Sequence, residues 1–177
     1  MKIYYTLFVL LSTSLVMTAQ DFEKLDKSPM DAVITRNQDN SLLVRITYSR
    51  PQKKGHKIFG NSVPFGKLWR TGANEATEIT LYEDILINGE KINSGTYTLY
   101  SILNEQNWEI IINKATNTWG AYNYDESLDV LRTTVPVKRT SASIENFSIH
   151  FKPTDMGTDL LIGWDNTFVE IPIQKAK

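Results

Sequence analysis

The sequence predicts an all-β fold: an antiparallel β-sandwich, jelly-roll or immunoglobulin-like, of about nine or ten strands. Three observations support this prediction. Apolar and polar residues alternate with a period of two through most of the chain, and turn signals recur at intervals of roughly 8–12 residues. No long segment after the N-terminus has helical periodicity. The chain has 177 residues, 41% of them hydrophobic, which suits one domain with its own core.

Residues 1–19 are expected to be a secretory signal peptide rather than part of the fold. Lys2 supplies a basic start, the following residues are largely apolar, and the small residue Ala19 precedes a polar one, which predicts cleavage after Ala19. The apolar run is shorter than the stretch of about 20 residues that a membrane span needs, so an uncleaved anchor is the weaker alternative. The mature chain, residues 20–177, is therefore expected to be a single exported domain, periplasmic or extracellular, without a membrane span.

Composition narrows the classes of function. The chain contains no cysteine, so its stability must come from packing and sheet pairing, and thiol chemistry is excluded. The formal net charge is −1 and the basic residues are scattered, so neither a nucleic-acid surface nor a polybasic membrane patch is visible. We expect no nucleic-acid partner. The sequence does not fix the oligomeric state.

Short alternating segments follow one another along the mature chain. Residues 21–31 are polar and contain a Ser-Pro pair, which indicates a lead-in segment. The pair Asn88-Gly89 lies between two short apolar segments and predicts a two-residue hairpin, because both central positions need positive φ. Trp108 and Trp164 lie within predicted strands and are expected in the core. The predicted strands are residues 42–49, 77–82, 85–87, 90–92, 96–103, 108–113, 128–137, 146–151, 159–164 and 168–173.

Two segments interrupt the alternation: residues 51–76, the first loop, and residues 114–126, the second loop. Both are longer than ordinary hairpin loops of about 2–5 residues. Long loops on a rigid β scaffold often carry binding and catalytic residues, so we expect the two to meet at one end of the sandwich. The candidate ligand-binding residues are Arg50, Trp69, Arg70, Asn74, Glu75, Trp119, Tyr122, Tyr124 and Asp125.

These residues favour binding of a small or saccharide-like ligand, or of an envelope protein partner. Aromatic rings offer stacking surfaces, and a few Arg, Asn and acidic groups supply convergent polar contacts. A secreted hydrolase is the alternative, with Glu75 and Asp125 as its acid and base. In the third interpretation the loops have a purely structural or interaction role, and Arg70 pairs with Glu75 or Asp125 to hold them together.

The sequence supplies no motif for a cofactor, a metal or a catalytic nucleophile. The two histidines, His56 and His150, lie far apart and have no metal-ligand spacing. No serine occupies a nucleophile elbow, and no phosphate loop or dinucleotide fingerprint is present. We therefore expect no metal and no cofactor, and we assign no catalytic residue.

Five segments are distinctive enough to compare with known families. They are YSRP…KG…IFG (48–60), VPFGKLWRTGANEATEI (63–79), GTYTLY (95–100), WGAYNYDE (119–126) and LLIGWDNTFVEIPI (160–173). With these segments the chain resembles an exported bacterial family known only as domain of unknown function 2911. The resemblance covers nearly all of the mature chain. It implies a signal peptide and a compact β-rich domain, and it implies no activity.

Overall fold

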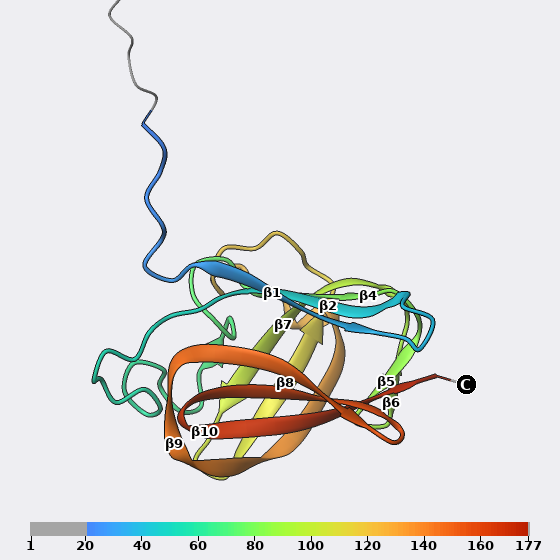
Figure 1. The fold of residues 1–177 in the computed structure, drawn as a ribbon. Helices are drawn as coiled ribbons and strands as arrows, with labels where there is room; N and C mark the ends of the chain where they lie inside the picture. The colour runs from blue at the N-terminus through green and yellow to red at the C-terminus, as the bar shows by residue number, and fades with distance from the viewer. Residues whose placement is uncertain (1–20, 177) are drawn as a thin grey trace, which may run out of the picture.

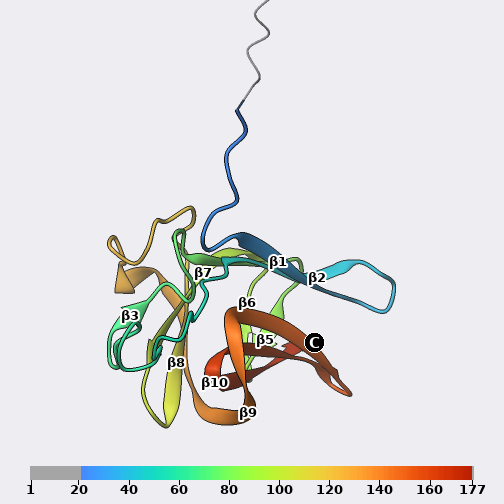
Figure 2. The same ribbon diagram turned by 60° about the vertical axis from the view of Figure 1, so that its left-hand side comes forward.

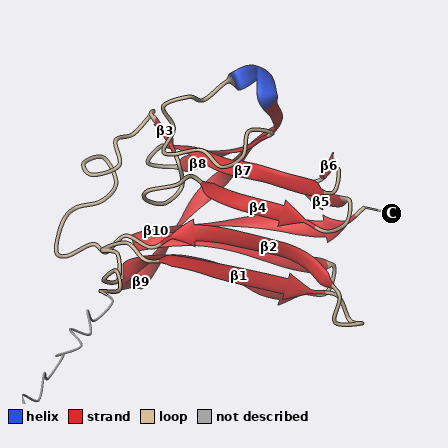
Figure 3. Cartoon of the chain, turned by 90° about the horizontal axis from the view of Figure 1, so that it is seen from above, coloured by secondary structure: helices blue, strands red, loops and turns tan. Residues whose placement is uncertain are grey.

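The computed structural model describes residues 21–176. The predicted signal peptide and its cleavage site lie outside the described residues. Within them the fold is all-β, as predicted, apart from one short 3₁₀ helix, η1 (Glu126–Leu128), which Figure 3 shows in blue. No helix in this part of the chain has the length and apolar character needed to cross a membrane.

The strands form one antiparallel sheet of ten members that is not closed. Its order is β1-β2-β4-β7-β8-β9-β10-β5-β6, and β3 pairs with β7 beside this path. Strands β1, β2 and β4 lie across from β9 and β10 (Figure 1). A jelly-roll or immunoglobulin-like sandwich stays a prediction. The strands are β1 (Met30–Arg36), β2 (Leu42–Ser49), β3 (Leu68–Trp69), β4 (Thr77–Leu81), β5 (Ile85–Ile87), β6 (Glu90–Ile92), β7 (Gly95–Leu103), β8 (Asn107–Asn113), β9 (Asp129–Thr154) and β10 (Gly157–Lys175).

Strands β9 and β10 are each longer than predicted. Each joins two of the predicted strands into one. Residues 138–145 and 165–167 continue the strands although their side chains do not alternate between apolar and polar, and Ile144 and Arg139 pair with Asp165 and Thr167. The register shifts on both sides of Asp165, which has a φ of +54°. Such bulges bend a strand and redirect side chains. The long hairpin therefore curves instead of ending, as Figure 1 shows.

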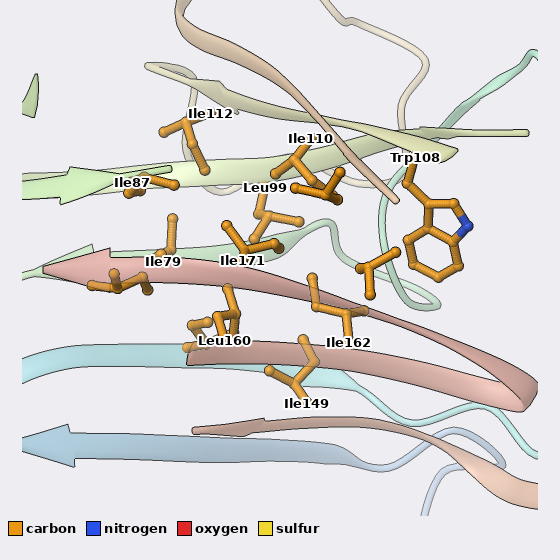
Figure 4. Packing of buried hydrophobic residues seen from close by; sticks show 14 of the residues in the cluster. Ile79, Ile87, Leu99, Trp108, Ile110, Ile112, Ile149, Leu160, Ile162 and Ile171 are labelled. Atoms are coloured by element: carbon orange, nitrogen blue, oxygen red, sulfur yellow. The ribbon is translucent and has the colours of Figure 1, made fainter. Parts of the chain in front are cut away.

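One main apolar core fills the space enclosed by the sheet. Buried side chains of β2, β4, β7 and β8 pack together with those of β9 and β10. Trp108 and Trp164 are only 1% and 5% exposed, so their predicted core positions are confirmed. Trp108 lies at one end of the labelled apolar side chains in Figure 4. Ile58, Phe59 and Val63 of the first loop belong to the same core.

Candidate functional site

The first loop contacts two different parts of the molecule. Its early part packs against β9 and the β7–β8 turn: the Lys53 amide donates to the Glu145 carbonyl at 2.8 Å, and the Gly66 amide donates to the Leu103 carbonyl at 2.8 Å. Its later part contacts the second loop: Asn74 and Ala76 are hydrogen-bonded to it through the main chain, and Arg70 lies near Gly120. Figure 2 shows the second loop on the same side of the molecule as β3. The two loops therefore meet through the later part of the first loop.

A short antiparallel bridge joins the two loops. Glu75 and Trp119 form its central pair. On either side, the amides of Ala76 and Gly120 donate to carbonyls of the opposite loop at 2.9 and 3.1 Å. Main-chain pairing of this kind fixes the two segments without using their side chains. The side chains of Glu75 and Trp119 are consequently left free for contacts outside the bridge.

The backbone of the first loop has an unusual conformation just before the bridge. Thr71 and Asn74 have φ values of +54° and +56°, and positive φ is uncommon for a β-branched residue such as threonine. The Thr71 hydroxyl lies 2.8 Å from the Ser101 hydroxyl, and the Thr77 hydroxyl donates to the Thr71 carbonyl at 2.6 Å. The side chains of Thr71, Thr77 and Ser101 are all buried. The positive φ of Thr71 costs about 1–3 kcal/mol, and these hydrogen bonds offset that cost.

A groove runs beside the bridge. It consists of two adjoining hollows of about 280 and 250 Å³, which share Met30, Ser49 and Glu75. We call it the loop groove. Its lining includes three carboxylates, Asp26, Glu75 and Glu78, and no lysine or arginine. The lining residues are Asp26, Ser28, Met30, Thr47, Tyr48, Ser49, Asn74, Glu75, Ala76, Glu78, Asn117, Thr118 and Trp119.

Two predicted aromatic residues of the second loop face solvent. Trp119, which lines the groove, is 60% exposed, and Tyr122 is 79% exposed. The Tyr122 ring lies so close to Gly120 that a β-carbon there would come within 2.7 Å of the ring. Most other large aromatic residues between residues 21 and 176 are buried or half-buried. Trp119 and Tyr122 are therefore available to stack on a ligand.

Trp69 belongs to the core rather than to an open surface. Its ring stacks on Trp164 at 6.4 Å and meets Trp108 and Phe147 edge-on at 6.3 and 5.2 Å. Its indole Nε1 donates to the Gly72 carbonyl at 3.0 Å. These contacts give Trp69 a packing role at the base of the first loop.

Arg50 holds three strands together. Its guanidinium forms an ion pair with Asp31 of β1 at 2.9 Å, donates to the Phe147 carbonyl of β9 at 3.1 Å and donates to the Ser148 hydroxyl at 3.0 Å. Since all three of its nitrogen atoms already have partners, Arg50 is committed to structure.

Tyr124 fixes the far end of the second loop. Its hydroxyl donates to Asp129 at 2.5 Å and accepts from Arg132 at 2.6 Å, while its ring meets Tyr100 edge-on at 5.3 Å. Burial, followed by the hydrogen bond to Asp129, raises the pKa of Tyr124 well above its ordinary value. The hydroxyl therefore stays protonated and acts as a structural donor.

Asp125 caps the 3₁₀ helix η1. Its carboxylate accepts from the Ser127 hydroxyl at 2.7 Å and from the Ser127 amide at 2.9 Å. The hydrogen bond from the Ser127 hydroxyl has the larger effect and that from the amide the smaller, and both lower the pKa of Asp125 below its ordinary value. A carboxyl group that serves as a general acid needs a raised pKa instead.

The predicted ion pair of Arg70 with Glu75 or Asp125 is wrong. Among residues 21–176, Arg70 forms no salt bridge, and its Nε is buried without a hydrogen-bond partner. The physical reason is local: the bridge leaves Glu75 exposed, and Ser127 occupies the Asp125 carboxylate. Arg70 instead lies near Gly120, with Nη1 3.6 Å from where a β-carbon would stand.

Sequence reasoning missed part of the groove. Asp26, Ser28 and Met30 were expected in a plain lead-in segment, yet they form one wall. The Asn74 amide donates to Asp26 at 3.1 Å, and the Ser28 amide donates to the same carboxylate at 2.6 Å. The second contact is an Asx turn that the sequence suggests. Nothing in the sequence indicates that this turn reaches the first loop.

The structure therefore brings Asn74, Glu75 and Trp119 together in one groove, with Arg70 and Tyr122 beside Gly120. No group of three or more potential metal ligands occurs within residues 21–176. The model of the family described as "Protein of unknown function (DUF2911)" matches residues 28–173. No curated protein and no solved structure matches the chain.

Proposed function

Because the chain belongs to the DUF2911 family, whose description states no activity, we propose a function from the site alone. In this proposal the chain is an exported domain that binds a small, hydroxyl-rich ligand of saccharide type in the loop groove. It binds the ligand without converting it. A jelly-roll or immunoglobulin-like sandwich would present the groove at its loop end.

The exposed Trp119 carries the proposal. A tryptophan that is 60% exposed, yet held by a main-chain bridge at the edge of a groove, offers a flat apolar surface at little entropic cost. The neighbouring Glu75 carboxylate and Asn74 side chain supply hydrogen-bonding groups for hydroxyls. This combination of an aromatic face and a few polar groups is typical of small-molecule sites.

The charge of the groove restricts the class of ligand that it can bind. Asp26, Glu75 and Glu78 line it, and no lysine or arginine does. An anionic ligand would be repelled by these carboxylates, whereas neutral hydroxyls can donate charge-assisted hydrogen bonds to them. A neutral saccharide therefore suits the groove better than a phosphate or an organic acid.

The hydrolase interpretation has less support. It needs Glu75 and Asp125 on either side of one bond, with one of them protonated at neutral pH. The Asp125 carboxylate is engaged by Ser127, which lowers its pKa. Product formation from a bound oligosaccharide would favour this alternative. An envelope protein partner, or a purely structural role, would be favoured if no saccharide binds.

Replacing Trp119 with alanine is expected to weaken saccharide binding at least tenfold, which corresponds to about 1.4 kcal/mol. The measurement is isothermal titration calorimetry of residues 20–177 with neutral oligosaccharides of glucose, galactose and N-acetylglucosamine. Tyr82→Ala is the matched control, because Tyr82 is an exposed aromatic residue outside the groove. Absence of binding by every saccharide, or equal affinities of wild type and Trp119→Ala, would contradict the proposal.

Replacing Arg70 with methionine is expected to change the free energy of unfolding by less than about 1 kcal/mol, because no ion pair is lost and a buried unpaired Nε is removed. Urea denaturation measures this change. A loss of about 3–5 kcal/mol would instead indicate a buried pair that holds the loops, as in the structural interpretation.

A further inference from the structure

A second cavity lies outside the loop groove and shares no residue with it. Its volume is about 360 Å³, within the range of small-molecule sites. Its walls come from the early part of the first loop, the β7–β8 turn, β8, and the bulged region of β9 and β10. We call it the bulge pocket. It brings together segments that are far apart in the sequence.

One wall of the bulge pocket consists of packed aromatic side chains. Phe59 and Trp108 are 9% and 1% exposed, and their ring centroids are 5.4 Å apart. Phe65 is half-buried and packs against the same core. Gly60 lies directly under the Phe65 ring, since a β-carbon there would come within 2.8 Å of it. The pocket thus offers a rigid aromatic surface for the apolar part of a ligand.

The polar side of the pocket lies where the register between β9 and β10 is irregular. Arg139 of β9 stands opposite Thr167 in the strand register, and its Nη1 donates to the Thr167 hydroxyl at 2.7 Å. Asp165 is held on the other side by Lys53 at 2.6 Å. The guanidinium of Arg139 is therefore positioned by one of its donors, and the others stay available.

The charge balance of the free groups is positive. Among residues 21–176, Arg139 and Lys57 have no carboxylate partner, while the Asp165 charge is compensated by Lys53. Glu105 is the remaining carboxylate of the lining, so two cations face one anion. Arginine is well suited to carboxylates, because its planar fork donates two parallel hydrogen bonds.

We propose that the bulge pocket binds a small organic carboxylate with an apolar body. The body packs against Phe59 and Phe65, and the carboxylate binds Arg139 with support from Lys57. This site is independent of the saccharide site: it differs in its residues, in its charge and in the ligand that it takes.

Titration calorimetry with phenylacetate as the probe tests this proposal. We expect phenylacetate to bind residues 20–177, and to bind at least tenfold more weakly to Arg139→Gln and to Lys57→Gln. Lys67→Gln is the matched control, because Lys67 is exposed in the same loop but does not line the pocket. Its affinity should stay within twofold of wild type. Urea denaturation of each variant establishes that it is folded.

Two related probes separate carboxylate recognition from general apolar binding. 2-Phenylethanol and phenethylamine carry the same apolar body without the carboxylate, and each should bind at least tenfold more weakly than phenylacetate. The proposal is overturned if either binds as tightly, if phenylacetate does not bind, or if neither variant weakens it. Trp119→Ala should bind phenylacetate as wild type does, so failure of the saccharide site is distinguishable from failure of this one.

Discussion

Replacing Gly157 with alanine is expected to destabilise the domain by about 3 kcal/mol or more. Gly157 begins β10 with a φ of +154°, where other residues are strained. A β-carbon at this position would stand 2.2 Å from the carbonyl oxygen of Ile173, near the end of the same strand. The carbonyl oxygen belongs to the backbone and the position of a β-carbon is fixed by the backbone, so no side-chain rotation relieves the clash. The start and the end of the curved β10 would have to separate.

Gly89→Ala is the control for this variant, because Gly89 also has positive φ, +87°, but has open space around its α-carbon. Its cost should be limited to the backbone conformation, about 1–2 kcal/mol. Urea denaturation with an unchanged m-value measures the difference in unfolding free energy between each variant and the wild type. Equal costs for the two variants, or a Gly157→Ala cost below that of Gly89→Ala, would show that the curvature of β10 tolerates the extra atom.

The strands that could be predicted from the sequence are those whose apolar residues recur at alternate positions or form a short apolar run. In residues 42–49 apolar side chains recur at every second position from Leu42 to Tyr48, and β2 has the same bounds as the predicted strand. The hairpin at Asn88 and Gly89 was equally readable, because its φ values of +49° and +87° require a specific turn chemistry. In both cases the signal is local, so no knowledge of distant contacts is needed.

The elements that were missed depend on distant contacts. Strand β1 alternates only between half-buried and exposed residues at the edge of the sheet, so its two faces differ little in sequence. Residues 138–145 are mostly exposed and resemble a loop, yet they belong to β9, and Arg139 and Ile144 pair with Thr167 and Asp165 of β10. Pairing through the backbone leaves no hydrophobic pattern to detect.

The candidate site follows the same division. The bridge between Glu75 and Trp119 lies in the two loops that interrupt the alternation, and those loops were visible from the sequence. The wrong pairing of Arg70 arose from its spacing to Glu75, which does not specify side-chain directions where Thr71 and Asn74 have positive φ. The bulge pocket was not foreseen, because its residues come from separate segments with no shared motif.

Replacing Arg132 with methionine is expected to cost about 2–4 kcal/mol of unfolding free energy. Arg132 of β9 binds Asp129 at 2.8 Å, the Tyr124 hydroxyl at 2.6 Å, and Glu109 and Glu126 at 3.3 Å each. The Asp129 side chain is only 8% exposed, so its charge would be left among neutral donors. The range lies below that of a fully buried pair because Arg132 itself is 30% exposed.

A second substitution tests the cause of this loss. In the double variant Arg132→Met with Asp129→Asn, the buried charge is gone, so the protein should be more stable than Arg132→Met alone. Lys91→Met provides the surface comparison: it breaks the solvated pair with Asp84 at 3.1 Å and should cost less than about 1 kcal/mol. Urea denaturation measures all three. If Arg132→Met costs no more than Lys91→Met, the network around Asp129 does not hold the second loop.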